Sequence, residues 1–198
     1  MSGERKPRLV LASASPARLQ TLRNAGIEPE VVVSGVSEDD VTGAPYDIAA
    51  VLAARKARAV ALLHPDAYVI GCDSVLDFEG QPLGKPADAA EATARWQAMR
   101  GRDGVLLTGH HVVAPDRREV SAVAATTVRF ADVDDDEIAA YVATGEPMRV
   151  AGGFTLDGLG GAFVYGVEGD PHNVVGISLP TLRDLLGDLG IRWTDLWA

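Results

Sequence analysis

The sequence predicts a mixed α/β fold in which helices pack against a central sheet. Short apolar runs alternate with segments of helical character over much of the 198 residues. Further along, two long β-rich runs, 104–114 and 120–130, flank a turn at 115–118 and predict an antiparallel hairpin. No internal repeat or low-complexity linker divides the chain, which suits a single domain.

The first half of the chain is expected to alternate strands and helices. Ser15 followed by Pro16 has the residue types favoured at the N-cap and first position of a helix, and Gly26 is suited to end it. Residues 47–63 are rich in alanine and contain no Gly or Pro, which favours a second helix. The runs that predict strands are 9–12, 30–34 and 68–71. The last run leads directly to Asp73, where we expect the strand to end.

The second half is expected to contain short strands, helices and a tight loop. Two strand-like pieces within 74–85 meet at a turn formed by Glu79 and Gly80. Four acidic residues, 134–137, open a helix that runs to about Ala143. Acidic side chains suit the positive end of a helix dipole, so we interpret this run as capping rather than metal binding. The glycine-rich segment 151–161 predicts the loop, and the other expected helices are 88–99 and 178–189.

Composition argues against several classes of partner. The net charge of −10 disfavours broad binding to nucleic acid, which needs basic surface, although a local cluster of Lys and Arg can still bind a small anion. No apolar run approaches the ~20 residues of a membrane span, so no membrane partner is expected. The single cysteine, Cys72, cannot form an internal disulfide. We expect it to be a small core residue and the protein to be cytoplasmic.

Residues 13–18, Ser-Ala-Ser-Pro-Ala-Arg, form a candidate phosphate-binding segment. They follow a strand and open a helix, where free backbone N–H groups and the helix dipole attract phosphate. The hydroxyls of Ser13 and Ser15 and the guanidinium of Arg18 add further donors. The same spacing also fits an ordinary capped helix with a surface arginine, and spacing alone does not decide between the two.

Asp73 and Lys85 are candidates for catalysis and phosphate binding. Active sites of open α/β sheets lie beyond the carboxyl ends of strands, where a carboxylate can bind Mg²⁺ or accept a proton from water. The alternative for Asp73 is a turn residue that caps the backbone. Lys85 stands between Gly and Pro, with little local backbone freedom, which suits a phosphate ligand. A surface lysine would show the same pattern.

Lys56 and Glu38 give weaker signals. Lys56 lies mid-helix among alanines beside Arg55 and Arg58, and one of the three is expected to face a cleft while the others face solvent. Glu38 follows a strand and either holds a metal or is a solvated loop acid. Neither a P-loop nor a dinucleotide-binding glycine pattern is present in the sequence.

Taken in order along nearly the whole chain, a series of segments resembles the Maf family. The segments that carry the resemblance include LVLASASPARLQTLRNAG, LAARKARAV, VIGCDSVL, LGKP, AGGFTLDGLGG and EGDPHNVVGISLP. One such match would be weak, whereas the ordered series is specific.

The resemblance implies both a fold and an activity. The fold would be a single domain, 1–198, with a curved central sheet and two lobes enclosing a cleft, similar in outline to the inosine triphosphate pyrophosphatases. The activity would be hydrolysis of a nucleoside triphosphate to its monophosphate and pyrophosphate, with Mg²⁺ or Mn²⁺ as cofactor. The family also implies a role in removing altered nucleotides, a link to septum formation, and a homodimer.

The resemblance assigns roles to individual residues. Asp73, in the sequence GCDS, matches the general base of the family, and Glu38 matches a carboxylate that lies with it near the metal. The residues that match phosphate-binding groups are Ser13, Arg18, Lys56 and Lys85.

The chain departs from the family pattern at three places. Ala17 stands where the family usually has the first of two arginines, and Arg149, before Val150, replaces a usual Asp-Lys pair. Asp157 stands where pyrimidine-selective members often have Gln, so it is the candidate for base selectivity. Loss of the arginine at position 17 supports an alternative function, a catalytically weak nucleotide-binding regulator of cell division. A phosphatase that releases single phosphates is a further alternative.

Overall fold

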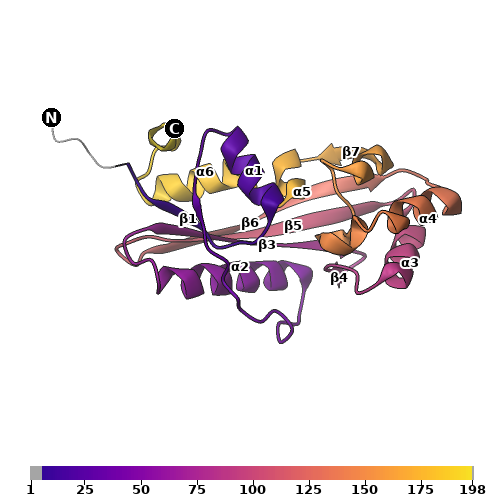
Figure 1. Ribbon diagram of the computed structural model, residues 1–198, viewed down its shortest axis with the longest axis horizontal. Coiled ribbons are helices and arrows are strands. Elements are labelled where there is room, and N and C mark those ends of the chain that lie inside the picture. Colours follow the sequence, from indigo (N-terminus) through magenta and orange to yellow (C-terminus); the bar gives the residue numbers. More distant parts are fainter. Residues whose placement is uncertain (1–5, 198) are drawn as a thin grey trace.

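The computed structural model describes residues 6–197 and contains a mixed sheet of seven strands with helices on both faces (Figure 1). This confirms the predicted mixed α/β class. The strands are β1 (Leu9–Leu11), β2 (Glu30–Val31), β3 (Tyr68–Phe78), β4 (Gln81–Leu83), β5 (Asp103–Val113), β6 (Glu119–Phe130) and β7 (Val164–Glu168). The helices are α1 (Pro16–Asn24), α2 (Pro45–Ala61), α3 (Ala89–Met99), α4 (Asp135–Ala143), α5 (Pro171–Val175) and α6 (Leu179–Asp188).

The sheet has the strand order β2-β1-β3-β5-β6-β7, and β4 pairs with β3 outside this path. β1 runs parallel to both of its neighbours, whereas the pairs from β3 to β7 are antiparallel. The long β5–β6 hairpin lies where the sequence predicts one. Within the described residues, none of the helices is long and apolar enough to cross a membrane.

Two predicted strand boundaries are wrong. The strand expected at 30–34 ends at Val31, because only Glu30 and Val31 pair with β1. The second concerns the strand that leads to Asp73. The sequence suggests that a strand ends at Asp73 and that two shorter pieces follow, but β3 continues from Tyr68 to Phe78. The reason is tertiary, because β3 pairs with β5 without interruption from Val69 to Asp77. Asp73 therefore lies in the middle of a strand. The turn at Glu79 is confirmed, since it has a φ of 54° and leads into β4.

Helix capping follows the sequence closely. The Ser15 hydroxyl accepts a hydrogen bond from the backbone N–H of Arg18, which caps α1 as predicted. Asp134 and Glu137 form a reciprocal capping box at the start of α4, so the acidic run is confirmed as a cap.

The sequence reasoning missed β7 and α5. The glycine-rich loop contains two short 3₁₀ turns, Ala151–Gly153 and Leu159–Phe163.

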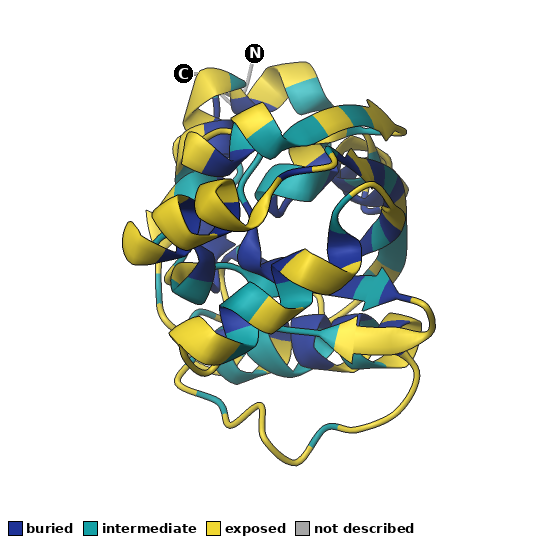
Figure 2. Cartoon of the chain, turned by 90° about the vertical axis from the view of Figure 1, so that its right-hand side faces the viewer, coloured by how far each residue is buried: buried dark blue, intermediate teal, exposed yellow. Residues whose placement is uncertain are grey.

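Two large hydrophobic clusters lie at different places along the long strands. Viewed from one end of the molecule, buried segments of strands and helices face the interior and exposed segments lie mostly on the outside (Figure 2). One joins the strands to α1 and α6 around residues such as Leu22 and Leu186. The other is centred on Trp96 of α3, whose ring contacts Phe130 and Tyr141 edge to face and whose indole N–H donates to the carbonyl of Gly153 at 2.9 Å. Because β3, β5 and β6 run through both clusters, the two ends of the molecule share one rigid sheet.

Glycines allow α2 to pack directly on the sheet. A Cβ on Gly109 of β5 would lie 2.1 Å from the carbonyl oxygen of Ala49, and one on Gly71 of β3 would lie 2.3 Å from that of Ala53. No side chain fits in those two places. The resulting close approach sets how near the side chains of α2 come to β3.

We expect Gly109→Ala to destabilise the fold by about 1–3 kcal/mol, because the added methyl group must push α2 away from the sheet. Chemical denaturation would measure the change. Gly187→Ala is the matched control, since a Cβ at this helical position of α6 meets nothing within 4 Å. It should be neutral or stabilise by up to ~1 kcal/mol. Equal stability of Gly109→Ala and wild type would contradict this account of the packing.

Candidate functional site

The candidate site lies where β3 has no neighbouring strand on one edge. β1 pairs with β3 only as far as Ile70, and β4 begins to pair with it at Leu76. Among the described residues, no strand pairs with that edge between these two positions. Asp73 and Ser74 lie in this interval. As consecutive residues of a strand, their side chains point to opposite faces of the sheet.

The start of α1 reaches one side of this interval. The Ser13 hydroxyl accepts a hydrogen bond from the backbone N–H of Ser15 at 3.1 Å, and Ser15 caps the helix. The chain therefore turns directly from β1 into α1. This arrangement places the amino end of the helix, with its partial positive charge, beside the middle of β3.

Arg18 is a buried cation that has only neutral partners. It is 9% exposed, and its Nε donates to the carbonyl of Gly176 at 2.7 Å. Its two terminal nitrogens donate to the hydroxyls of Ser13 and Ser74, each at 3.1 Å. Within residues 6–197, no carboxylate lies within 4.0 Å of its guanidinium. A buried charge without a counter-charge is costly, which favours an anionic ligand at this position.

Lys56 lies on the other face of the sheet and joins two carboxylates. Figure 1 shows α1 and α2 on opposite sides of the sheet. From α2, the Lys56 Nζ donates to Asp73 Oδ1 at 2.6 Å and lies 2.7 Å from Glu38 Oε1. Its neighbours on the helix point elsewhere, since Arg55 pairs with Asp40 and Arg58 pairs with Glu119. Lys56 is thus the one of the three cations that faces the interval in β3.

Burial and charge act on Asp73 in opposite directions. Asp73 is 7% exposed, and this burial raises the pKa of its carboxyl group above the ordinary value. The ammonium of Lys56 and the guanidinium of Arg18 oppose the rise, whereas Glu38 adds to it. The neighbouring Cys72 is fully buried, and burial raises the pKa of its thiol to about 11, so it is the unreactive core residue that the sequence predicted.

The oxygen donors of Glu38 and Asp73 suit a divalent cation shared with a ligand. Both carboxylates approach the same ammonium, so their oxygens lie close to each other. Within the described residues, no group of three or more His, Cys, Asp or Glu side chains is arranged to hold a metal ion. Two carboxylates with water and phosphate oxygens are a typical set of ligands for Mg²⁺, so the donors fit a cation bound together with phosphates.

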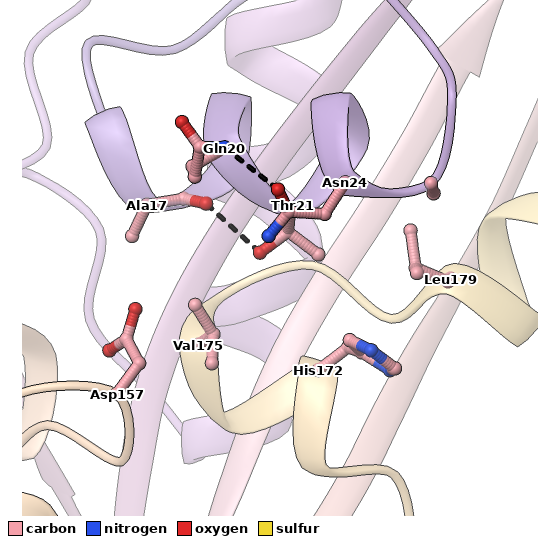
Figure 3. A pocket seen from close by; sticks show the side chains of 9 residues that line it. Ala17, Gln20, Thr21, Asn24, Asp157, His172, Val175 and Leu179 are labelled. Carbon is pink, nitrogen blue, oxygen red and sulfur yellow. Dashed lines mark hydrogen bonds between the residues drawn. The ribbon is translucent and has the colours of Figure 1, made fainter.

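Two candidates lie apart from this cluster of side chains. Lys85 is exposed in the segment after β4 and, among the described residues, takes part in no ion pair. Its segment is held by the carbonyl of Gly84, which accepts a hydrogen bond from Arg95 at 2.6 Å. Asp157 is also exposed and lines a surface hollow of about 240 Å³ between α1 and α5. In Figure 3, Ala17 and Asp157 lie on the same side of this hollow, with His172 on the other.

Sequence reasoning named Ser13 but missed the other polar groups that hold Arg18. Ser74 gave a signal, because it follows Asp73 directly. Thr108 lies opposite Ser74 in the pairing of β3 with β5, and this could be found only after that register was known. The carbonyl of Gly176 carries no signal in the sequence, since any residue type provides a carbonyl.

The fold and the arrangement of charges are typical of α/β proteins that bind a phosphate-bearing anion. The family model for Maf-like proteins matches residues 8–189, and the chain belongs to this family. Its relatives include a protein from Streptomyces coelicolor that is 60% identical over 203 residues, with 100% of this chain and 98% of that protein covered. A second, from Salinispora tropica, is 58% identical and covers 100% of this chain and 91% of its own length. Both relatives are named nucleoside triphosphate pyrophosphatases.

Solved structures give a more distant likeness. The Staphylococcus aureus Ham1 protein is 18% identical, with a TM-score of 0.44, and the match covers 63% of this chain and 72% of that one. A nucleoside-triphosphatase from Mycobacterium abscessus matches with a TM-score of 0.41.

We expect the pKa of Asp73 in the folded protein to lie above that of an ordinary aspartate, and Lys56→Gln to raise it further. Removing the ammonium takes away the main charge that opposes the effect of burial. Carboxyl ¹³C NMR of Asp73 over a pH titration would measure both values. Arg55→Gln is the matched control, because its side chain pairs with Asp40 and should leave the pKa of Asp73 unchanged. A lower pKa in Lys56→Gln would contradict this electrostatic assignment.

Proposed function

We propose that this protein hydrolyses nucleoside triphosphates to nucleoside monophosphate and pyrophosphate with the help of a divalent cation. The observation that carries the proposal is the buried Arg18 in the first turn of α1, which within residues 6–197 hydrogen-bonds only to neutral groups and lies near the Lys56–Asp73 pair. The names of relatives that are 58–60% identical over the whole chain support the same reaction. Phosphoryl transfer depends mainly on positioning and charge stabilisation, which these side chains can supply.

The proposed roles belong to side chains on the two faces of the sheet, next to the open edge of β3. Arg18, Ser13 and Ser15, with the N–H groups of α1, bind phosphate oxygens on one face of the sheet. Lys56 and the more distant Lys85 neutralise further phosphate charge. Water attacks the α-phosphorus and pyrophosphate leaves; Asp73 either accepts the proton of that water directly or would hold the cation that lowers the pKa of the water. Because its pKa is raised, Asp73 is a stronger base than an ordinary aspartate.

Glu38 and Asp73 are the residues that would hold the cation, Mg²⁺ or Mn²⁺. Such an ion neutralises phosphate charge and lowers the pKa of bound water. Asp157, at the rim of the hollow beside α1, is the proposed contact for base selectivity. We further propose that the chain is one domain of two lobes and forms a homodimer, and that its activity serves either to remove altered nucleotides or in septum formation.

The alternative function is a nucleotide-binding regulator with weak catalysis. Its support is Ala17, which removes one cation from the start of α1. The exposed side of α1 that carries Ala17 faces the hollow, whereas Arg18 turns inward toward Ser74. The retained contact between Lys56 and Asp73 favours the enzyme, because binding alone does not require a buried base.

A substrate panel tests the proposed function. Canonical and modified nucleoside triphosphates would be incubated with the protein and Mg²⁺ or Mn²⁺, and the products would be separated. Release of monophosphate and pyrophosphate supports the enzyme. Release of orthophosphate indicates a phosphatase, and tight binding without turnover indicates the regulator.

Asp73→Asn should lower kcat by about 10²–10³ while the fold survives, because the amide keeps the shape of the carboxylate but cannot accept the proton. Turnover would be measured as pyrophosphate release, with circular dichroism as the check on folding. Asp184→Asn, on the exposed surface of α6, is the control and should turn over at the wild-type rate. Near-normal turnover in Asp73→Asn would remove Asp73 from the mechanism.

Arg18→Lys should lower kcat/KM by about tenfold to a hundredfold, although the charge is kept. A lysine cannot reproduce the fork that donates to Gly176, Ser13 and Ser74 at once. Arg23→Lys, on the same helix but in an exposed pair with Glu28, should leave kcat/KM unchanged. Steady-state kinetics on both variants decide the matter, and equal loss in the two would show that the effect is not specific to Arg18.

A further inference from the structure

A chain of hydroxyl groups leads from Arg18 into the core. Ser74 and Thr108 are opposite each other in the β3–β5 pair, and their side-chain oxygens lie 2.9 Å apart. Thr108 is fully buried, and its Oγ1 lies 3.1 Å from the backbone carbonyl oxygen of Asn173 on α5. Three hydrogen bonds therefore connect the guanidinium to a short helix that is distant in sequence.

The direction of each hydrogen bond in this chain is determined. A carbonyl oxygen only accepts, so Thr108 must donate its single proton to Asn173. The oxygen of Thr108 then accepts the proton of Ser74. The oxygen of Ser74 is left to accept from Arg18, which has only donors. All three bonds thus point from Arg18 toward α5, and each one fixes the orientation of the next.

α5 is itself fixed to the sheet. The side-chain amide of Asn173 is fully buried and donates to the carbonyls of Leu106 and Ala124 and to the hydroxyl of Thr126. The carbonyl of Gly176, which ends the helix, accepts from Arg18 Nε. The guanidinium is therefore held to α5 at two points, directly through Gly176 and indirectly through the two hydroxyls.

We propose that Thr108 is a positioning residue that fixes the plane of the Arg18 guanidinium through Ser74. Arg18 donates hydrogen bonds to Gly176, Ser13 and Ser74. Each of its two terminal nitrogens carries a second N–H that these bonds do not use. Fixing the plane also fixes the directions of these two remaining donors, which suits the binding of phosphate oxygens. The identity of that anion rests on the proposed function, whereas the positioning itself rests on the hydrogen bonds alone.

The test compares Thr108→Val with Thr108→Ser. Valine keeps the shape but breaks the chain at its centre, so we expect kcat/KM for the best nucleoside triphosphate to fall by about tenfold or more. Serine restores the hydroxyl and should recover activity to within about twofold of wild type. Thr126→Val is the control for stability, because it removes another buried hydroxyl that anchors α5 but has no contact with Ser74. It should affect kcat/KM less than Thr108→Val.

A double-mutant cycle separates positioning from a general structural effect. If Thr108 acts through Arg18, then Thr108→Val should cause no further loss of kcat/KM in an Arg18→Gln background. The Nη–H signals of Arg18 in ¹⁵N NMR should be protected from exchange in wild type and Thr108→Ser and lose that protection in Thr108→Val, because a terminal nitrogen donates to Ser74. A full additional loss in the Arg18→Gln background, or wild-type kcat/KM in Thr108→Val, would overturn the proposal.

Failure of the positioning proposal can be distinguished from failure of the proposed enzymatic function. If the wild-type protein releases no pyrophosphate with any nucleotide, the proposed function fails. The positioning proposal is then decided by exchange of the Arg18 Nη–H signals and by calorimetric binding of inorganic pyrophosphate. Weaker binding in Thr108→Val than in Thr108→Ser supports positioning, and equal binding and equal exchange contradict it.

Discussion

Between Ile70 and Leu76, β3 pairs with β5 on one edge, while β1 has ended and β4 has not begun on the other. The strand stays straight through this interval because of its continuous pairing with β5. Two neighbouring polar side chains, Asp73 and Ser74, can therefore point to opposite faces of the sheet and still lie beside an open edge. The start of α1 and the middle of α2 then meet at that edge from the two faces, and each brings one cation.

The two cations are in different electrostatic situations. Arg18 is buried, and among the described residues its hydrogen bonds go to neutral acceptors and no carboxylate lies within 4.0 Å of it, which favours an anion. Lys56 already lies between Glu38 and Asp73, so that side has more negative than positive charge. The close packing of α2 on Gly71 and Gly109 brings Lys56 to Asp73, so a packing constraint sets the charge balance around Asp73.

Local signals in the sequence predicted much of this arrangement. Ser15 before Pro16 fixed the start of α1, and the alanine-rich segment predicted α2, because capping and helix propensity are properties of neighbouring residues. The end of the third strand was wrong, since only pairing with β5 shows that Asp73 lies mid-strand. The links from Arg18 to Thr108 and Gly176 could not be predicted, because they join residues at least 90 positions apart, and the second involves a backbone carbonyl. Lys85 and Asp157, which rested mainly on family resemblance, lie outside the hydrogen-bonded cluster.

The central claim is that Asp73 activates a water molecule that attacks the α-phosphorus. The most direct measurement is to run the reaction in H₂¹⁸O with a nucleoside triphosphate that the protein cleaves and to locate the label by mass spectrometry. We expect ¹⁸O in the nucleoside monophosphate and none in the pyrophosphate. Label in pyrophosphate would mean attack at the β-phosphorus, and label in orthophosphate would mean a phosphatase; either result would contradict the account.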